Sequence, residues 1–444
     1  MEEKEKVDSP ESNFSRRAFI GSVALAGAAL AACGGGQEES ATTRSTRPLI
    51  TPGPDTAPDG PVLTAGLIGC GGRGTGAALN FLESGPNLQI TALADVFQDR
   101  LDTCRRNLKE KAGVEVPDER CFVGFDAFQK LIDTDVDIVI HATPPHFRPL
   151  HFEAAVNARK HVFMEKPVAV DPWGVRSIIA TAERADAFGL CVATGTQFRH
   201  QKSFIETYNR VADGAIGDIL AARAYSLRGQ LWYRERQPEW SDMEAMLRDW
   251  VNWNWLSGDL IVEQHIHGLD VLFWFTGDYP AKAIGQGARH RRVTGDQYDS
   301  FSVDYELPNG VHLTSLSRQM DGCTNNISRW VVGTKGYTNC ENTIYDHEGN
   351  IIWQYEGQDD KSPYVQEHTD LVTAIRTGNR VNEAFVMAES TLSAIMGRES
   401  AYTGQEVLRE QLKQSDMRLG PTEYAMGPVN IEAVVPVPGT EGDV

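Results

Sequence analysis

A glycine-rich turn between a strand pattern and a helical pattern constrains the fold of this chain more than any other feature. Residues 62–68 form a short apolar run typical of a buried parallel strand. The turn follows as Gly69-Cys70-Gly71-Gly72-Arg73-Gly74, and a helical pattern begins near Ala77. In such a turn the first glycine permits the tight bend, the second lets a pyrophosphate approach the backbone, and the third allows close helix–strand packing. The motif predicts a dinucleotide at the N-terminus of the helix.

The next apolar run supports this prediction and favours one dinucleotide. It ends at Asp95, which lies 21 residues after Gly74. A carboxylate at that spacing accepts hydrogen bonds from the adenosine ribose and repels a 2′-phosphate, so the sequence favours NAD over NADP. Arg73, inside the turn, either reaches a phosphate or stays solvated.

Strand and helix patterns alternate as far as residue 193, which predicts a doubly wound α/β Rossmann domain over residues 61–195. Two later strands, residues 136–142 and 161–164, end in polar residues. Thr143 and His146 follow the first strand, and Glu165-Lys166-Pro167 follows the second. Ligands of such sheets bind beyond the carboxyl ends of the strands, so these side chains are expected beside the cofactor.

The pattern changes after residue 195. Residues 196–365 show alternating hydrophobicity and turn signals such as Pro308-Asn309-Gly310, which predict an α+β domain with a large, mostly antiparallel open sheet. Helical patterns return in residues 366–420 and are expected to pack back near the Rossmann domain. Residues 421–444 are rich in Pro and Gly and are expected to form an extended tail.

The first 33 residues have the pattern of an export signal. Arg16 and Arg17 precede a short, mildly apolar stretch that ends in Leu30-Ala31-Ala32-Cys33. Paired arginines before such a stretch predict a twin-arginine signal, and the final four residues resemble a lipoprotein cleavage site with Cys33 as the acylated residue. Residues 34–60 read as a flexible linker. The sequence thus predicts a periplasmic or cell-envelope lipoprotein that touches the membrane only through this lipid anchor.

Charge and cysteine spacing exclude other classes. The formal net charge is −19, and a chain this acidic repels the phosphate backbone of nucleic acids. The six cysteines after Cys33 form no C-x-x-C pair, so neither a structural zinc site nor a thioredoxin-like site is predicted.

One apolar segment, residues 257–274, carries an unusual set of ionisable side chains. Glu263 and His267 are four residues apart, and Asp270 follows three residues later, so a helix would place Glu263 and His267 on one face. His265 would point elsewhere. Two alternatives remain: these groups are paired on a half-buried helix with a purely structural role, or the segment is extended and Glu263, His265 and His267 form one metal-binding face. The helical interpretation uses no metal.

The order of these motifs resembles that of the Gfo/Idh/MocA family of NAD(P)-dependent sugar oxidoreductases. The resemblance rests on the glycine turn, the sequence Ala142-Thr-Pro-Pro-His146, and the Glu-Lys-Pro motif, and it covers roughly residues 61–400. It implies that Lys166 lies by the nicotinamide and the substrate hydroxyl, that His267 is the catalytic acid/base, and that Glu263 positions the substrate or the histidine. It also implies that the second domain assembles a homo-oligomer, a dimer or tetramer.

These interpretations define the predicted site. Lys166, His267 and Glu263 are the predicted catalytic residues. The predicted cofactor contacts are Gly69, Cys70, Gly71, Gly72, Arg73, Gly74, Asp95, Thr143, His146, Glu165 and Lys166. The predicted substrate contacts are Gln197, Arg199, Trp253, His265 and Asp270. Trp253 belongs to a tryptophan-rich stretch that suits stacking on sugar rings, although core packing accounts for some of these tryptophans equally well.

Two positions depart from the pattern of the family. The first acid is usually Asp, whereas Glu263 is one methylene longer, and the position of His265 usually holds a small residue. The predicted activity is an NAD-dependent oxidoreductase acting on a secondary hydroxyl of a sugar or glycoside, with the cofactor held tightly. The alternatives are an NAD-dependent glycoside hydrolase that oxidises its substrate transiently and a non-catalytic sugar-binding lipoprotein.

Overall fold

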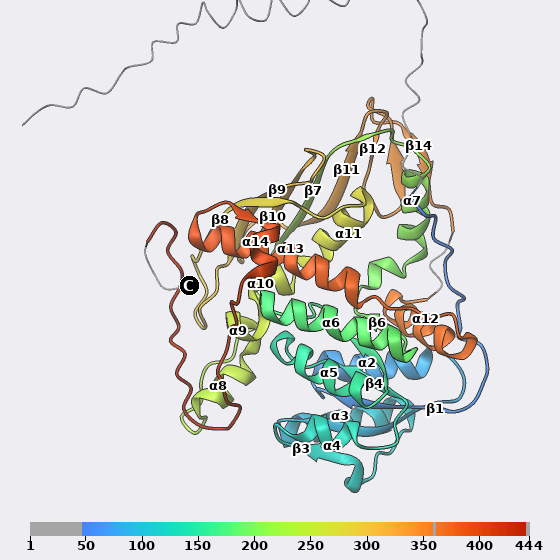
Figure 1. Ribbon diagram of the computed structural model, residues 1–444, viewed down its shortest axis with the longest axis vertical. Helices are drawn as coiled ribbons and strands as arrows, with labels where there is room; N and C mark the ends of the chain where they lie inside the picture. Colours follow the sequence, from blue (N-terminus) through green and yellow to red (C-terminus); the bar gives the residue numbers. More distant parts are fainter. Residues whose placement is uncertain (1–46, 358–360, 441–444) are drawn as a thin grey trace, which may run out of the picture. The chain divides into compact units, whose positions relative to one another are not determined.

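The computed structural model describes residues 47–357 and 361–440. The predicted export signal and residues 34–46 lie outside the described residues. The ribbon in Figure 1 follows the remaining chain through a parallel sheet, a second sheet and the helices that cover them.

The first sheet is the predicted Rossmann sheet. Its six strands run in the order β3-β2-β1-β4-β5-β6, and every pair is parallel. This order brings the carboxyl ends of β1 and β4 side by side, at the point where the order reverses and dinucleotides bind. The strands are β1 (Leu63–Ile68), β2 (Leu88–Asp95), β3 (Cys121–Val123), β4 (Ile138–His141), β5 (His161–Met164) and β6 (Val192–Thr194).

Helices pack on this sheet in two groups. One group, α2, α3 and α12, is linked by contacts of α2 with both other helices, and the other, α4, α5 and α6, is linked through α5. The apolar strands β4 and β5 are almost wholly buried beneath them, as a parallel sheet requires. The helices are α2 (Gly72–Glu83), α3 (Gln98–Ala112), α4 (Ala127–Ile132), α5 (Arg148–Asn157), α6 (Pro172–Phe188) and α12 (Pro363–Thr377), with short 3-10 turns at η1 (Asp118–Arg120) and η2 (Pro145–Phe147).

The second sheet has nine strands in the order β14-β13-β12-β11-β7-β10-β9-β8-β15. Neighbours are antiparallel except for β7 and β10. Buried and less buried residues alternate along β9 and β10, so one face is covered. This confirms the predicted fold class. The strands are β7 (Ile219–Arg228), β8 (Lys282–Ala288), β9 (Ser300–Glu306), β10 (His312–Gln319), β11 (Asn326–Gly333), β12 (Tyr337–Thr338), β13 (Thr343–Tyr345), β14 (Ile351–Gln354) and β15 (Val407–Leu408).

Helix α13 joins the two sheets, because it contacts α6 on one side and α10, α11, β8 and β9 on the other. Arg398 of α13 is fully buried and donates to Glu399 and to the carbonyls of Val170 and Gly258, so one side chain ties both domains to this helix. The remaining helices are α7 (Lys202–Ala212), α8 (Asp242–Arg248), α9 (Asn254–Ser257), α10 (Asp259–Glu263), α11 (Ile266–Thr276), α13 (Ala384–Thr403) and α14 (Arg409–Gln414), with 3-10 turns at η3 (Gln197–Arg199) and η4 (Trp250–Asn252).

Residues 47–60 differ from the flexible linker predicted for them. The backbone N–H of Ile50 donates to Asn209 at 2.8 Å, and the carbonyl of Pro54 accepts from Gln366 at 2.8 Å. Ala57 is only 2% exposed and donates its N–H to the carbonyl of Ser84. The prediction was wrong here because a low-complexity composition does not reveal the polar partners that α7 and α12 supply.

The tail after α14 is extended, and both domains hold it in place. In Figure 1 it runs past α9 to α8 and returns. Asp171 accepts from the N–H of Leu419, α8 exchanges hydrogen bonds with the tail at Gly427 and Val429, and Tyr298 donates to the carbonyl of Pro436. Its route therefore crosses the boundary between the domains.

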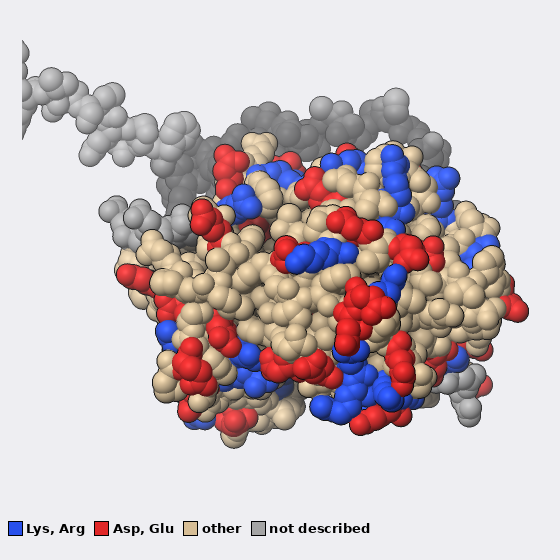
Figure 2. All heavy atoms as spheres, turned by 90° about the horizontal axis from the view of Figure 1, so that it is seen from below, with Lys and Arg blue, Asp and Glu red and all other residues tan. Residues whose placement is uncertain are grey.

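Three further features of the described residues concern membrane-spanning helices, surface charge and cysteines. No helix among them is long and apolar enough to cross a membrane. Acidic and basic side chains are interspersed over the face shown in Figure 2, so no basic stripe crosses it. The six cysteines that the structure describes are free thiols.

Candidate active site

The glycine turn after β1 has the backbone geometry of a phosphate cradle. Gly69 has φ +95, and a Cβ there would lie 2.8 Å from the carbonyl carbon of Ala142. A Cβ on Gly74 would lie 1.8 Å from the carbonyl oxygen of Gly69, so α2 packs too closely on β1 for any side chain. A Cβ on Gly71 or Gly72 would meet nothing within 4 Å, so this part of the turn faces open space. These residues fit a dinucleotide, whose pyrophosphate needs an unobstructed backbone.

A cleft of about 460 Å³ lies over this turn. Asp95 lines it at the end of β2, and its carboxylate already accepts the N–H groups of Cys70 at 2.7 Å and Phe97 at 2.9 Å. A carboxylate has roughly four acceptor sites, so it still has capacity for ribose hydroxyls. Other lining residues are Gly69, Gly71, Gly72, Arg73, Gly74, Arg100, Thr143, Phe147, Trp232, Arg234, Trp250 and Tyr424.

Four predicted cofactor contacts do not line this cleft: Glu165 and Lys166 line the second cavity described below, and Cys70 and His146 line neither. The thiol of Cys70 is buried behind the turn, 3.6 Å from the carbonyl oxygen of Ala94. The ring of His146 bonds the hydroxyl of Tyr424 at 2.7 Å and packs edge-on against Trp255. Position after a strand does not fix the direction of a side chain, so neither of these two groups faces the cleft.

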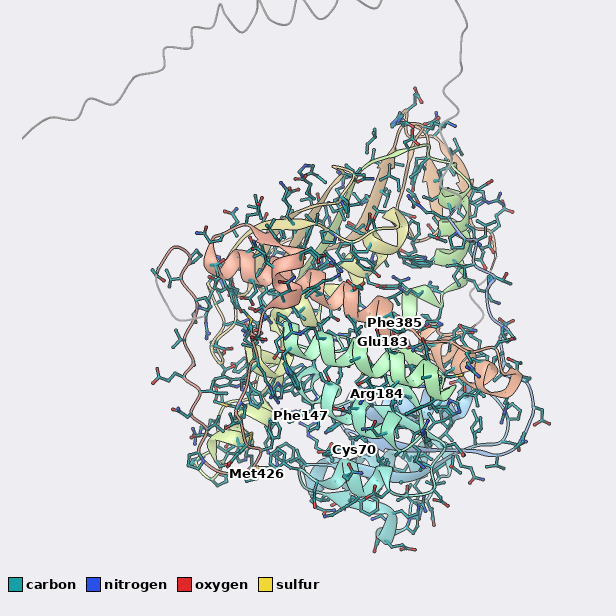
Figure 3. The ribbon with its side chains drawn as sticks, in the orientation of Figure 1. Cys70, Phe147, Glu183, Arg184, Phe385 and Met426 are labelled. Carbon is teal, nitrogen blue, oxygen red and sulfur yellow. The ribbon has the colours of Figure 1, made fainter. Side chains whose placement is uncertain are left out.

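The tail forms one wall of the cofactor cleft. Tyr424 contacts Phe125 and Phe147 as well as His146, with ring centroids 6.3 Å and 5.2 Å away for the two phenylalanines. In Figure 3, Met426 marks the turn of the tail beside α8, and Phe147 lies between the tail and the parallel sheet. The sequence predicted an extended tail but gave no indication that it covers this cleft.

A second cavity, of about 450 Å³, adjoins the first. Both are lined by Arg73, Ala142, Trp232 and Trp250, which therefore mark the junction between them. The second cavity lies between the domains, because Glu165 and Lys166 line it from the Rossmann domain and residues of β7, α11 and β11 line it from the second domain. The second cavity therefore joins the dinucleotide cleft at the four shared residues.

Lys166 and Glu263 form a buried ion pair in the second cavity. The Lys166 ammonium donates to Glu263 Oε1 at 2.9 Å and to the Glu263 carbonyl oxygen at 2.5 Å. Burial raises the pKa of Glu263, but the charge and hydrogen bond of Lys166 outweigh it, and the pKa is lowered overall. Glu263 contacts Lys166 and Gln264, whereas the predicted alternatives were the substrate or His267.

His267 lines the same cavity and makes no hydrogen bond with any residue the structure describes. Its ring packs edge-on against Phe198, with centroids 5.9 Å apart. Burial and the nearby charge of Lys166 lower the pKa of His267 well below its ordinary value. The imidazole is therefore neutral at pH 7, and it can accept a proton.

Arg73 connects the glycine turn to the residues that follow β5. Its guanidinium pairs with Glu165 at 2.5 Å and with the fully buried Glu367 at 3.4 Å, and it stacks over Tyr364. Glu165 thus holds Arg73 at the junction. Glu367 and Tyr364 belong to α12, and sequence reasoning missed them because their partners lie nearly 300 residues away.

The segment predicted as one helix is broken at Gln264. Helix α10 ends at Glu263, and α11 begins at Ile266, with His265 at the cap between them. The break brings both His265 and His267 to the cavity. The extended, metal-binding alternative is wrong because the backbone is helical on both sides, and the residues the structure describes contain no group of three side chains that could hold a metal ion.

Three predicted substrate contacts lie elsewhere. Arg199 forms a two-point ion pair with Asp270, at 2.8 and 2.9 Å, and Ser390 also donates to Asp270. This buried group fastens η3, α11 and α13 together. Trp253 packs on the apolar cluster around Trp255 and not in the cavity.

Of the other predicted substrate contacts, Gln197 and His265 line the cavity. The aromatic residues in its wall are Trp232, Trp250, Phe198, Tyr225 and Tyr364. Arg228 and Arg329 also line it, and sequence reasoning missed both. The alternation along β7 places Arg228 on the face of buried Ala224 and Ser226, which is a signal that was available once the strand was assigned.

Comparison with known proteins agrees with this architecture. Residues 63–194 match the model of the oxidoreductase family with an NAD-binding Rossmann fold, and residues 204–338 match the Gfo/Idh/MocA C-terminal domain. The chain belongs to the Gfo/Idh/MocA family. The first match identifies its cofactor as NAD.

Curated relatives of this Gfo/Idh/MocA protein align over part of their length. A myo-inositol 2-dehydrogenase of Thermotoga maritima is 27% identical over 226 residues, which is 51% of this chain and 58% of the relative. A glycosyl hydrolase family 109 protein of Shewanella sp. (strain ANA-3) is 30% identical over 234 residues, which is 50% of this chain and 48% of the relative. The chain thus spans about half the length of the curated relatives it matches.

Solved structures of the family share the fold. The scyllo-inositol dehydrogenase of Lactobacillus casei with bound NAD(H) and scyllo-inositol has a TM-score of 0.60 at 22% identity, covering 79% of this chain and 99% of that one. The aldose-aldose oxidoreductase of Caulobacter crescentus has a TM-score of 0.61 at 21% identity, covering 78% and 99%.

Asp95 is expected to set the choice of dinucleotide. Replacing it with Ser removes charge-assisted hydrogen bonds, so the affinity for NAD should fall roughly tenfold to a hundredfold. NADP affinity should rise, because Arg100 and Arg234 line the same cleft and can meet a 2′-phosphate. Fluorescence titration of nucleotide-free protein measures both constants. Asp99→Asn on α3 is the control, and an unchanged NAD preference in Asp95→Ser would contradict the role of Asp95.

Proposed function

We propose that this protein is an NAD-dependent oxidoreductase that transfers a hydride between a tightly bound nicotinamide and a secondary hydroxyl of a sugar or glycoside. One observation carries the proposal: Lys166 and the neutral imidazole of His267 line one cavity, and that cavity joins the dinucleotide cleft at Arg73. Bound NAD supplies the hydride acceptor. The protein must hold the hydroxyl, take its proton and stabilise the oxygen.

Lys166 meets the reacting oxygen in this proposal. Its ammonium has three donors, of which Glu263 occupies two through its carboxylate and carbonyl oxygens. One donor remains for the substrate oxygen, where a positive charge stabilises the alkoxide that develops as the hydride leaves. Glu263 is therefore a positioning residue that fixes where the ammonium points.

His267 takes the proton. Because its pKa is lowered, the base form is present throughout the neutral range, and because it bonds none of the described residues, a ring nitrogen is free for the substrate hydroxyl. In the reverse direction the same nitrogen returns the proton.

A second candidate is a glycoside hydrolase that oxidises its sugar, eliminates the leaving group and returns the hydride. The family 109 relatives favour it, because one of them is 30% identical to this chain. Both candidates use the same base and cofactor, so they differ in whether the reduced nicotinamide persists.

Replacing His267 with Ala tests the proposal. Loss of a general base should slow sugar oxidation about a hundredfold to ten-thousandfold while NAD stays bound. The readout is absorbance of the bound nicotinamide near 340 nm when sugars are added. His312→Ala, at an exposed position of β10, is the control.

The pH profile gives a second test of His267. Since burial and Lys166 lower the pKa of His267, kcat/KM of the wild type should decline only well below pH 6.5.

The absorbance assay also separates the two candidate functions. Lasting reduction of the bound nicotinamide supports the oxidoreductase, and product release without lasting reduction supports the hydrolase. Full activity of His267→Ala, or no response to any sugar and no bound nucleotide in the wild type, would refute the assigned chemistry and support a non-catalytic binding protein.

Tight retention of NAD follows from the tail in this proposal. Tyr424→Ala removes a hydrogen bond and two aromatic contacts that hold the tail on the cofactor cleft. The release rate of NAD should rise at least about tenfold. Measuring NAD content after repeated desalting checks this, with Met426→Ala, exposed on the same tail, as the control. Rapid release from the wild type would contradict tight binding.

We also propose export by the twin-arginine route, lipidation at Cys33 and self-association through the second sheet. The support is the sequence around Arg16, Arg17 and Cys33, together with the open face of the nine-stranded sheet. Tight NAD binding suits export, because this route carries folded proteins and free NAD is scarce outside the cytoplasm. Mass spectrometry of the membrane fraction tests all three. A diacylated N-terminus at Cys33 and a dimeric or tetrameric native mass are expected, whereas an unprocessed cytoplasmic monomer would contradict them.

A further inference from the structure

The wall of the second cavity that belongs to the nine-stranded sheet carries two arginines that form no salt bridge with a carboxylate of the described residues; Glu341 acts on Arg329 only through its charge. Arg228 lies at the end of β7 and Arg329 lies in the neighbouring strand β11. The nitrogen Nε of each is buried and lacks a hydrogen-bond partner among the described residues. Arg228 bonds only the amide of Gln264, at 3.4 Å, and Arg329 lies over the rings of Phe198 and Phe204.

His265 faces the same space. It is 1% exposed, and both of its ring nitrogens lack a partner within the described part of the chain. Burial and the charges of Arg329 and Arg228 lower its pKa to about 3, so the ring is neutral. A neutral imidazole carries one N–H, which is an unused donor beside the unused Nε donors of the two guanidinium groups.

The other charges of the cavity do not balance these arginines. The lining contains five cationic side chains and two carboxylates. Glu165 is paired with Arg73, and Glu263 is paired with Lys166. Neither Arg228 nor Arg329 lines the dinucleotide cleft, so the phosphates of the cofactor do not account for them.

We propose that the sugar substrate carries an oxyanionic substituent, a carboxylate, sulfate or phosphate, which binds between Arg228, Arg329 and His265. This inference rests on the proposed function and names the substrate class of the same site. A buried cation without a counter-charge is costly, and a guanidinium binds an oxyanion through two parallel hydrogen bonds. A neutral hydroxyl would occupy one donor and leave the positive charge uncompensated.

The positions of Lys166, Arg228 and Arg329 define how the bound sugar is oriented in the cavity. Lys166 comes from the Rossmann domain, whereas Arg228 and Arg329 come from the second sheet. His265 and His267 flank the start of α11, so the anion-binding donor and the proton acceptor are two residues apart. The break between α10 and α11 therefore lets the side chains of His265 and His267 contact the same substrate. The unusual histidine at position 265 then serves to bind the anionic substituent.

The test compares charged sugars with matched neutral ones. D-glucuronate, glucose 6-sulfate and glucose 6-phosphate are offered beside D-glucose to protein that retains its bound NAD, and reduction near 340 nm is followed. At least one charged sugar should show a KM at least tenfold below that of glucose, and the three arms identify the oxyanion. Equal or better use of glucose would overturn the proposal.

Variants locate the anion site. Arg228→Gln and Arg329→Gln should each raise the KM for the charged sugar at least tenfold while changing the KM for glucose less than threefold. His265→Phe should act in the same direction. Arg223→Gln is the matched control, because Arg223 lies on β7 but outside the cavity. Equal effects on charged and neutral sugars would show that the arginines only shape the cavity.

A binding measurement separates this proposal from the proposed function. If no sugar reduces the bound NAD, the oxidoreductase proposal fails, but glucuronate, sulfate or phosphate should still raise the midpoint of thermal unfolding. Glucose should not do so, and Arg228→Gln and Arg329→Gln should abolish the shift. No shift with any oxyanion, or an equal shift in the variants, would overturn the anion site itself.

Discussion

The ion pair between Lys166 and Glu263 is the contact on which the site depends. Lys166 follows a strand of the parallel sheet and Glu263 ends a helix of the second domain, so the pair fixes the position of one domain against the other. Both side chains are nearly buried, and breaking such a pair leaves an uncompensated charge at a cost of about 3–5 kcal/mol. The same contact therefore joins the domains and aims the ammonium into the cavity.

The parts of the site that follow from local sequence could be predicted. The run before Gly69 is apolar because a central parallel strand is covered on both faces, and the glycines are needed by backbone geometry alone. Lys166 follows directly from its place after β5. Alternation along β7 could place Arg228 on the buried face of its strand but not in the cavity. Arg329 and Glu367 could not be found from local sequence, because each acquires its role only when strands or helices distant in the chain meet.

The segment around His267 shows why residue spacing predicted the helical conformation but not the partner of Glu263. Four residues on one helix would pair Glu263 with His267, but Lys166 satisfies the glutamate instead and the helix breaks at Gln264. The break leaves His267 without a hydrogen-bond partner among the described residues, which suits a proton acceptor. Asp270 has a conventional explanation, since Arg199 and Ser390 occupy its carboxylate.

The route of the tail has a consequence for the order of assembly. Tyr424 lies after both domains in the chain, so a ribosome completes the glycine turn, the strands and the second sheet before it makes the segment that covers the cleft. A nucleotide can enter the finished cleft during that interval, and docking of Tyr424 on His146 then closes it. Among the described residues that line the cleft, Tyr424 is thus the one synthesised last, and its contact with His146 adds the final part of the wall.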